Sequence, residues 1–320
     1  LRTMTVSNSD FYVGGNLISA GGVGVRDHGI ARWNGSFWSA VGNCPIPDIK
    51  SLATIDGELF ACGSGQVARW DQLSWTVISN DSFDPCTIAA YNGQAYIGGW
   101  YPHSSTGTPG VVVRRWNGSA WQSVASALGN DPYSATIFNL TTFQNQLIGS
   151  GLAYQFAGSN ADHIARFDGS TWSPLSAGQA TSGSSPDIRA MVEVRGNLVA
   201  AGWFFGGGPN PPNRVAQWDG NSWLAMGAPF TGGSVNSLAS YQGEAIAAGG
   251  FPALNGSRSI VRWDGAQWQP LSTGVEGSVS AMTVFEGDLI VTGEFATAGG
   301  VSASGVARWN GTSWAAMGPS

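Results

Sequence analysis

Apolar and polar residues alternate over short stretches of this chain, and each stretch ends at a turn signal. Residues 52–55 and 238–241 are apolar and alternating, and turn dipeptides such as Asp56-Gly57 and Gln242-Gly243 follow them directly. A period of two residues is typical of β-strands, and no stretch has the 3.6-residue period of an amphipathic helix. Strands joined by turn signals at such short intervals indicate an all-β fold.

The strands belong to a repeat. A nine-residue segment that ends in Trp, with an aromatic residue five places before it, occurs seven times. The copies are residues 30–38, 67–75, 113–121, 164–172, 215–223, 260–268 and 306–314. A period of about 45 residues with one strand pattern is typical of β-propellers. We therefore predict a seven-bladed β-propeller of four-stranded antiparallel blades, with blades near residues 1–42, 43–79, 80–126, 127–176, 177–227, 228–272 and 273–320.

Each nine-residue segment reads as a hairpin. Asn-Gly or Asp-Gly between two strand-like runs favours a two-residue turn, which would place Trp33 opposite Ser36 and Ala31 opposite Trp38. The second blade has Asp71-Gln72 instead, so we expect strain there. In the third blade we expect Arg114 to stack on Trp121. The motif tryptophans should fill the space between blades: Trp38, Trp75, Trp121, Trp172, Trp223, Trp268 and Trp314.

An arginine recurs at one strand position of the repeat. Because equivalent positions on a ring point away from one another, we interpret these arginines as structural. We expect each to bond to backbone or carboxylate of a neighbouring blade, since charges inside a fold are paired. The set is Arg32, Arg69, Arg115, Arg166, Arg262 and Arg308, with Gln217 as the exception. The first repeat begins in its first strand and the last ends after its fourth, so we expect blades one and seven to close the ring by packing.

The connections between strands fall into two classes. Those from first to second and from third to fourth strand are tight, whereas those from second to third and from fourth to first vary. In an up-and-down blade the two classes emerge on opposite faces. Variable loops on a rigid scaffold are where binding usually resides. The variable connections include residues 17–29, 101–110, 153–162, 177–187 and 204–213.

Charge and cysteine content narrow the class of partner. The 320 residues carry a net charge of −6, which disfavours nucleic acid and anionic membranes because both require a basic surface. No stretch is apolar for long enough to insert into a bilayer. Cys44 and Cys86 precede the first strands of neighbouring blades, so we predict a disulfide between them, as suits an oxidising compartment. Cys62 lies within a predicted strand and should be a small buried hydrophobic residue.

The repeats resemble those of bacterial secreted and cell-surface propeller proteins with Ile-Ala-Arg-Trp-Asp-Gly-Ser-x-Trp segments, as residues 164–172 illustrate. These look like members of the broad kelch and galactose-oxidase-like propeller group, and fungal cell-surface cortical proteins carry similar repeats. The resemblance covers the whole chain and implies the architecture and an extracellular or cell-surface location. It implies little about activity. No residues match a copper site with His, Tyr and cross-linked Cys ligands.

Two tryptophans lie outside the hairpins and give the candidate site. Trp100 and Trp203 follow the glycine that ends the second strand in blades three and five, and Tyr101 and Phe204 come directly after them. Exposed aromatic rings bind sugar rings or peptide side chains, and the alternative is that these rings cover the blade ends as lids. Between the two blades lies the blade-four loop, so we add Tyr154 and Phe156 to the predicted ligand-binding residues.

Catalytic and metal-binding residues are not indicated by the sequence, and no cofactor is implied. The three histidines (His28, His103 and His163) lie in loops of blades one, three and four, so we interpret them as loop caps. Carboxylates near the variable face include Asp27, Asp162, Asp187, Glu276 and Glu294. We predict a secreted or surface-exposed binding or adhesion module for a glycan, peptide or extracellular protein. The alternatives are a carbohydrate-active hydrolase or lyase, and a structural spacer that self-associates.

Overall fold

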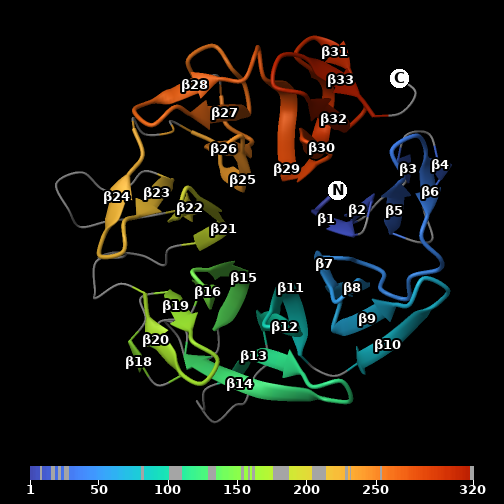
Figure 1. The fold of residues 1–320 in the computed structure, drawn as a ribbon, viewed down its shortest axis with the longest axis vertical. Coiled ribbons are helices and arrows are strands. Elements are labelled where there is room, and N and C mark those ends of the chain that lie inside the picture. The colour runs from blue at the N-terminus through green and yellow to red at the C-terminus, as the bar shows by residue number, and fades with distance from the viewer. Residues whose placement is uncertain are drawn as a thin grey trace.

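The structure is a computed structural model of the chain, and every described element is a strand, turn or irregular segment (Figure 1). It describes residues 1–7, 9–15, 19–20, 23–24, 29–80, 83–100, 110–128, 135–152, 155–157, 159–160, 163–175, 187–203, 214–227, 230, 232–252 and 254–317. Over these residues no helix is long and apolar enough to span a membrane.

The described strands form seven units of four antiparallel strands. Blade 1 contains β1 (Thr3–Ser7), β2 (Asp10–Gly14), β5 (Ile30–Trp33) and β6 (Trp38–Ala40). Blade 2 contains β7 (Ser51–Ile55), β8 (Glu58–Gly63), β9 (Gln66–Trp70) and β10 (Trp75–Asn80). Blade 3 contains β11 (Asp84–Tyr91), β12 (Gln94–Trp100), β13 (Gly110–Trp116) and β14 (Trp121–Leu128). Blade 4 contains β15 (Thr136–Phe143), β16 (Gln146–Leu152), β19 (Ile164–Phe167) and β20 (Trp172–Pro174).

The remaining blades repeat the pattern. Blade 5 contains β21 (Asp187–Val194), β22 (Asn197–Trp203), β23 (Val215–Trp218) and β24 (Trp223–Ala225). Blade 6 contains β25 (Val235–Tyr241), β26 (Glu244–Gly249), β27 (Ile260–Trp263) and β28 (Trp268–Pro270). Blade 7 contains β29 (Val275–Phe285), β30 (Asp288–Ala298), β32 (Val306–Trp309) and β33 (Trp314–Ala316). Short strands also occur in connections: β3 (Ser19–Ala20), β4 (Val23–Gly24), β17 (Gln155–Phe156), β18 (Ser159–Asn160) and β31 (Val301–Ser302).

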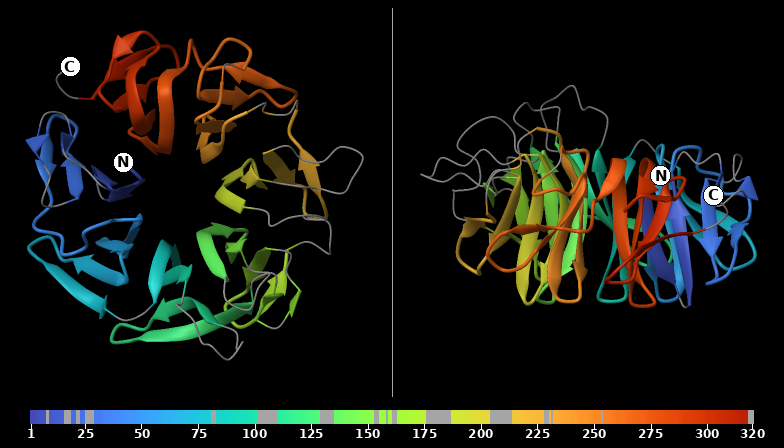
Figure 2. Two further views of the ribbon diagram at one scale, coloured as in Figure 1. Left: turned by 180° about the vertical axis from the view of Figure 1, so that it is seen from behind. Right: turned by 90° about the horizontal axis from the view of Figure 1, so that it is seen from above.

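The blades stand around a central axis, with the first strand of each blade innermost and the fourth at the rim (Figures 1 and 2). The predicted all-β propeller is confirmed. Because each blade is an antiparallel meander, successive connections alternate between its two ends. The tight turns, such as that at Asp56-Gly57, share the tight-turn face. The connections between second and third strands and between blades share the opposite end, the loop-rich face.

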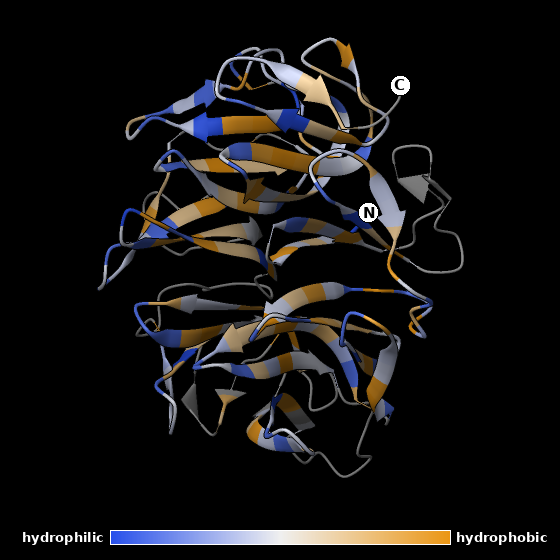
Figure 3. Ribbon diagram, turned by 45° about the vertical axis from the view of Figure 1, so that its right-hand side comes forward, coloured by the Kyte–Doolittle hydropathy of each residue, from blue (hydrophilic) through white to orange (hydrophobic). Residues whose placement is uncertain are grey.

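The hydrophobic core is divided among the interfaces between blades. Seven clusters of buried residues occur, and each combines residues of two neighbouring blades. Hydrophobic residues accordingly follow the strands where blades face one another (Figure 3). Burial of apolar area is the main favourable term in folding, so the ring is stabilised layer by layer.

The repeated hairpin has a different register from the predicted one. Trp33 pairs directly with Trp38, and Ala31 pairs with Ala40, so the connection has four residues. Asn34 Oδ1 accepts from the backbone N–H groups of Ser36 and Phe37, both at 3.0 Å. The Asn34 side chain therefore bonds to the N–H groups of the turn, and the prediction of a two-residue turn was wrong. The strain expected in blade 2 is confirmed by a φ of 78° at Gln72, a region that favours glycine.

The two motif rings of each blade pack against each other. Their centroids lie 5.0–5.5 Å apart in all seven blades. Four of the seven motif tryptophans are buried (Trp38, Trp172, Trp268 and Trp314), and Trp75, Trp121 and Trp223 are half-buried. Four indole N–H groups donate to a carbonyl of the preceding blade: Trp38 to Met317, Trp75 to Val41, Trp172 to Val124 and Trp268 to Met226.

Blades 1 and 7 meet by the same contacts. The Trp38 indole donates to the Met317 carbonyl at 2.9 Å, which is the bond that Trp75, Trp172 and Trp268 make inside the ring. The Phe11 and Phe285 rings lie 5.9 Å apart in the cluster shared by the two blades. The described strands of each of these blades come from one end of the chain. Side-chain packing therefore closes the ring, as expected.

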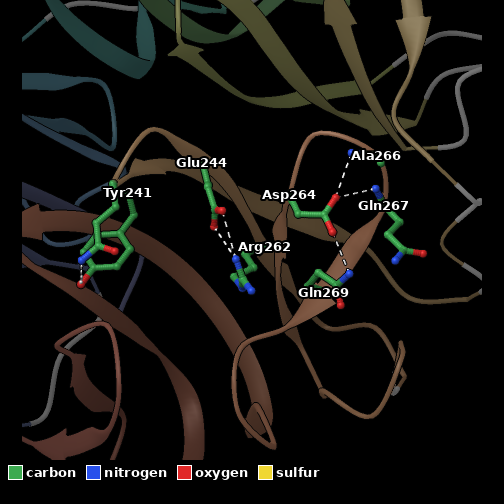
Figure 4. Close-up of polar contacts among 8 residues, drawn as sticks. Tyr241, Glu244, Arg262, Asp264, Ala266, Gln267 and Gln269 are labelled. Atoms are coloured by element: carbon green, nitrogen blue, oxygen red, sulfur yellow. Dashed lines mark hydrogen bonds and ion pairs between the residues drawn. The ribbon is translucent and has the colours of Figure 1, made fainter.

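The motif arginines bond within their own blade and not to the neighbouring one, so that expectation was wrong. Four of them pair with a carboxylate at the start of the second strand: Arg32 with Asp10, Arg69 with Glu58, Arg262 with Glu244 (Figure 4) and Arg308 with Asp288. The reason is the register, which places these residues near each other on adjacent strands. Arg115 instead donates to Gln122, and Arg166 to Ser173. Arg114 lies over the Phe83 ring at 4.6 Å, so its predicted stacking on Trp121 was also wrong.

Candidate functional site

Toward the loop-rich face the second strand of five blades contains a glycine at which the inner segment comes too close for a side chain. A Cβ placed on Gly99 would lie 2.3 Å from the Asp84 carbonyl oxygen, and one on Gly151 would lie 2.0 Å from that of Thr136. Gly63, Gly249 and Gly293 meet the same obstacle at 2.0–2.1 Å. Only glycine permits this approach. A glycine at this position of the sequence therefore indicates that the inner segment and the second strand approach each other closely there.

The inner strand has a β-bulge in five blades, and four of these (blades 3, 4, 6 and 7) also show this close approach. The register skips one residue in β11, β15, β21, β25 and β29. The extra residues are Cys86, Phe138, Arg189, Asn236 and Ser280. Bulges commonly redirect a side chain beside a functional site. A ring of five chemically different residues therefore lies at one level near the loop-rich end of the channel.

Trp100 and Trp203 follow these glycines and hold identical positions. Trp100 ends β12 and pairs with Asp84, while Trp203 ends β22 and pairs with Asp187. Trp100 also pairs with Thr136 of blade 4, which joins blades 3 and 4 into one sheet. Its side chain is half-buried, whereas that of Trp203 lies outside the described part. Each tryptophan is thus placed opposite an aspartate at the inner edge of the ring.

Charged residues beside Trp100 connect blades 1, 2 and 3. The ammonium of Lys50, the single lysine of the chain, lies 2.7 Å from Asp84 Oδ2. Asp84 Oδ1 accepts from the backbone N–H of Gly65 at 3.2 Å. Arg2 pairs with Asp48 at 3.0 Å. These half-exposed pairs fix the carboxylate of Asp84 next to the position of Trp100.

The other predicted binding residues have separate outcomes. Tyr101, Tyr154 and Phe204 lie outside the described residues. Phe156 is 1% exposed, and its ring centroid lies 4.5 Å from that of Trp172. It fills the core between blades 3 and 4. This burial contradicts the prediction that Phe156 contacts a ligand at the surface. The sequence pattern could not reveal this, because the short strand β17 that carries Phe156 pairs with β14 of the preceding blade.

The predicted disulfide between Cys44 and Cys86 is wrong, because all three cysteines are free. Cys44 is buried in the cluster shared by blades 1 and 2, whereas Cys86 is the bulge residue of β11 in blade 3. Burial raises the pKa of Cys44 to about 11, so its thiol remains protonated and unreactive at neutral pH. Cys62 is fully buried, as predicted.

Titratable groups on the described face have structural partners. His163 is buried, and its Nδ1 lies 3.1 Å from the Gly151 carbonyl oxygen, as a loop cap would. His28, His103, Asp27 and Asp162 lie outside the described residues. Glu276 accepts from Thr297 at 3.0 Å, and Glu294 is exposed. Over the described ranges, no group of three or more His, Cys, Asp or Glu residues could hold a metal ion.

The carboxyl groups with a shifted pKa belong to hairpin turns. Hydrogen bonds from the turn lower the pKa of Asp71, Asp168, Asp219 and Asp264. A general acid requires a raised pKa instead. Among the groups with shifted pKa in the described part, none is therefore a carboxyl suited to donate a proton at neutral pH.

Comparisons with known proteins identify the architecture. The chain is similar to the extracellular domain of a putative hybrid two-component system from B. thetaiotaomicron, with a TM-score of 0.64 and 12% identity over 95% of this chain. It spans 37% of that protein's chain, so little more than a third. The WD40 β-propeller domain of Doa1 has a TM-score of 0.59 and 12% identity, with 91% of this chain and 88% of that one covered.

A computationally designed protein, Ika8, is also similar, with a TM-score of 0.57 and 12% identity over 98% of this chain and 85% of its own. A scan against protein-family models found no match. A search of curated protein sequences also found none. At this level of identity the similarities establish the β-propeller fold and nothing finer.

Proposed function

We propose that the protein is a secreted or cell-surface binding module that recognises an extended glycan or peptide through its loop-rich face. The observation that carries this proposal is the shared position of Trp100 and Trp203. Thirteen of the fifteen tryptophans belong to the hairpins, and only these two stand at the inner edge of the loop-rich face, each opposite an aspartate.

The chemistry around Trp100 suits such a ligand. A half-buried indole offers a flat apolar surface, and Trp100 pairs across the strands with Asp84, whose carboxylate lies 2.7 Å from the ammonium of Lys50. Aromatic rings stack on the apolar faces of sugars and on peptide side chains, while carboxylates and ammonium groups bond to hydroxyl and amide groups. Blade 4 separates the two tryptophans, so a ligand that contacts both must be extended.

The proposed location rests on two further observations. One structural relative is itself an extracellular domain of a bacterial two-component system. A net charge of −6 is unfavourable for binding nucleic acid. Both support a partner that is a neutral or cationic molecule outside the cell.

The test is a glycan and peptide array screened with the purified chain, followed by Kd measurement for the best ligand. The double variant Trp100→Ala/Trp203→Ala should lose about 2–4 kcal/mol of binding free energy if both rings are anchors. A matched control is Phe37→Ala, which removes an exposed ring from the tight-turn face and should bind normally. Normal binding by the double variant would show that the site lies elsewhere.

A further inference from the structure

Near the tight-turn face, the last residue of the inner strand normally fills the space toward the next blade. Each of these residues pairs with the first residue of the second strand, so their positions are equivalent. In six blades the residue is large, apolar or aromatic, and buried: Ile55, Tyr91, Phe143, Val194, Tyr241 and Phe285. In blade 1 the same position is Ser7, which is also buried, at 4% exposure.

The larger residues reach the hairpin of the next blade. Tyr91 donates its hydroxyl to the Asn145 carbonyl, and Tyr241 donates to that of Trp309. A Cβ on Gly169 would lie 3.7 Å from the Tyr91 hydroxyl, and one on Gly311 would lie 3.5 Å from that of Tyr241. At these two interfaces, between blades 3 and 4 and between blades 6 and 7, the glycine of the turn therefore lies beside the tyrosine of the preceding blade.

Between blades 1 and 2 a small residue replaces the large one of the inner strand, and a larger residue replaces the glycine of the turn. Ser7 replaces the large residue, and Gln72, with its positive φ, replaces the glycine of the turn. The exchange does not fill the space, because a pocket of about 210 Å³ remains. Its lining includes Ser7, Asp10, Tyr12, Arg32, Trp70 and Gln72. The pocket therefore accompanies the one small residue among the seven equivalent positions at the end of the inner strand.

The Ser7 hydroxyl has free bonding capacity in this pocket. Among the described residues no hydrogen bond engages the hydroxyl of Ser7, although the residue is nine-tenths buried. The Ser7 oxygen is not among the buried unpaired side-chain atoms of the described residues, so it is accessible to a water or ligand in the pocket that it lines. Asp10 Oδ2 lies 2.8 Å from Arg32 Nε. Burial, and next the Asp10 carboxylate, raise the pKa of Tyr12, so its hydroxyl stays protonated at neutral pH.

The balance of charge indicates a neutral ligand. Asp10 and Arg32 already compensate each other, and a charged ligand would have to separate them or leave a charge unpaired, which is costly in a partly desolvated site. The hydroxyls, the Gln72 amide and the ion pair together offer both donors and acceptors. The Trp70 ring adds an apolar wall. Such a lining matches a molecule with several hydroxyl groups and one apolar face.

We propose that the pocket between blades 1 and 2 binds a single neutral monosaccharide unit. Its volume lies below the range of roughly 300–1,000 Å³ that is typical of drug-sized ligands, which limits the occupant to one ring. The site lies toward the face opposite the loop-rich one, so it does not depend on the proposed function.

Calorimetric titration of the intact chain with D-glucose, D-galactose, D-mannose and N-acetyl-D-glucosamine tests the proposal. At least one should bind with a Kd on the order of 1 mM, as expected for a ligand this small. Glucuronate and glucosamine serve as charged counterparts and should bind at least tenfold more weakly. Absence of saturable binding by all four neutral sugars, or tighter binding of a charged one, would overturn the proposal.

Two variants place the site. Ser7→Phe installs the residue type of the other blades and should weaken sugar binding at least tenfold. Arg32→Ala leaves the pocket open but removes a donor, so it decides the question if Ser7→Phe does not fold, and it should also weaken binding at least tenfold. The matched control is Asp288→Asn in blade 7, where Phe285 fills the equivalent space, and it should bind as the unmodified chain does. Unchanged affinity in either pocket variant would overturn the assignment.

Discussion

The interface between blades 1 and 2 and that between blades 6 and 7 share one framework but differ in what fills it. Both contain a carboxylate–arginine pair across the second and third strands, Asp10–Arg32 in one and Glu244–Arg262 in the other (Figure 4). In the 6–7 interface, Tyr241 is 5% exposed and its hydroxyl donates to the Trp309 carbonyl. In the 1–2 interface Ser7 stands there, and a pocket remains.

The difference shows that the framework does not depend on which residue stands at the end of the inner strand. The motif rings pack within each blade and the side-chain caps bond within each hairpin, so neither depends on the residue at the end of the inner strand. The residue at the end of the inner strand can therefore change from tyrosine to serine while the pairing there stays the same, Ser7 with Asp10 and Tyr241 with Glu244. A single residue at this position can therefore change the lining of one interface while the repeated strands stay the same.

The largest effect on stability is expected from a variant that removes the large residue from the interface between blades 6 and 7. Tyr241→Ser should destabilise the protein by about 3–5 kcal/mol, because it removes a buried aromatic ring and leaves a cavity. Urea unfolding followed by tryptophan fluorescence measures this. Tyr241→Phe is the control and should cost about 1 kcal/mol for the hydroxyl bond alone. A loss below 1 kcal/mol for Tyr241→Ser would mean that the interface collapses around the smaller residue.

A smaller effect is expected at the strained turn of the open interface. Gln72→Gly should stabilise the protein by about 1 kcal/mol, since glycine adopts positive φ without steric cost. The reverse change in blade 6, Gly265→Gln, should destabilise by a similar amount because Gly265 has a φ of 106°. Thermal unfolding of both variants checks the pair. Equal signs for the two changes would contradict the strain argument.

The ion pairs should contribute less. Glu244→Gln breaks the pair with Arg262 and should cost under about 1 kcal/mol, because both side chains are partly exposed and screened by solvent. The deficit should vanish in about 1 M salt, where the Debye length falls to about 3 Å. Denaturant titrations at low and high salt measure it. A cost that persists at high salt would indicate packing rather than charge.

The smallest effect at neutral pH is expected from the hairpin aspartate of blade 6. Backbone donation from Gln267, then the amide of Gln269, lowers the pKa of Asp264 from 3.8 to about 2 (Figure 4). Because the folded pKa is the lower one, the stabilisation is present above pH 4 and is lost as pH falls from about 4 to about 2. Asp264→Asn should remove this acid dependence while keeping the turn, as Asn34 does. NMR titration of the carboxyl carbon should give a midpoint near 2, and a midpoint near 4 would contradict the turn geometry.

The architecture was predictable because it is repeated. Seven copies of one pattern establish the strands and the turns, and the terminal glycine and motif tryptophans follow from it. Contacts that depend on side-chain geometry were harder to predict from the sequence. The hairpin register depends on the acceptor Oδ1 of Asn34, and Cys44 is directed into a core that its place in the sequence does not reveal.

The pocket between blades 1 and 2 has a signal in the sequence, which is a pair of departures from the repeat. Aligned at the end of the inner strand, six repeats have a large residue and one has Ser7, while the turn of the following repeat has Gln72 in place of glycine. The two departures concern residues far apart in the chain that face each other across one interface. Only the arrangement of the blades connects them.

The closing bond between Trp38 and Met317 has a consequence for chain entropy. It joins residues 279 apart, whereas the equivalent bond from Trp268 to Met226 joins residues 42 apart. Each doubling of a loop costs about 0.6 kcal/mol, so closure costs less than about 2 kcal/mol more than an internal contact. Contacts distant in sequence also form late during folding. We therefore expect the seam to be the last interface to assemble, at an energetic penalty small enough for ordinary packing of Phe11 and Phe285 to offset.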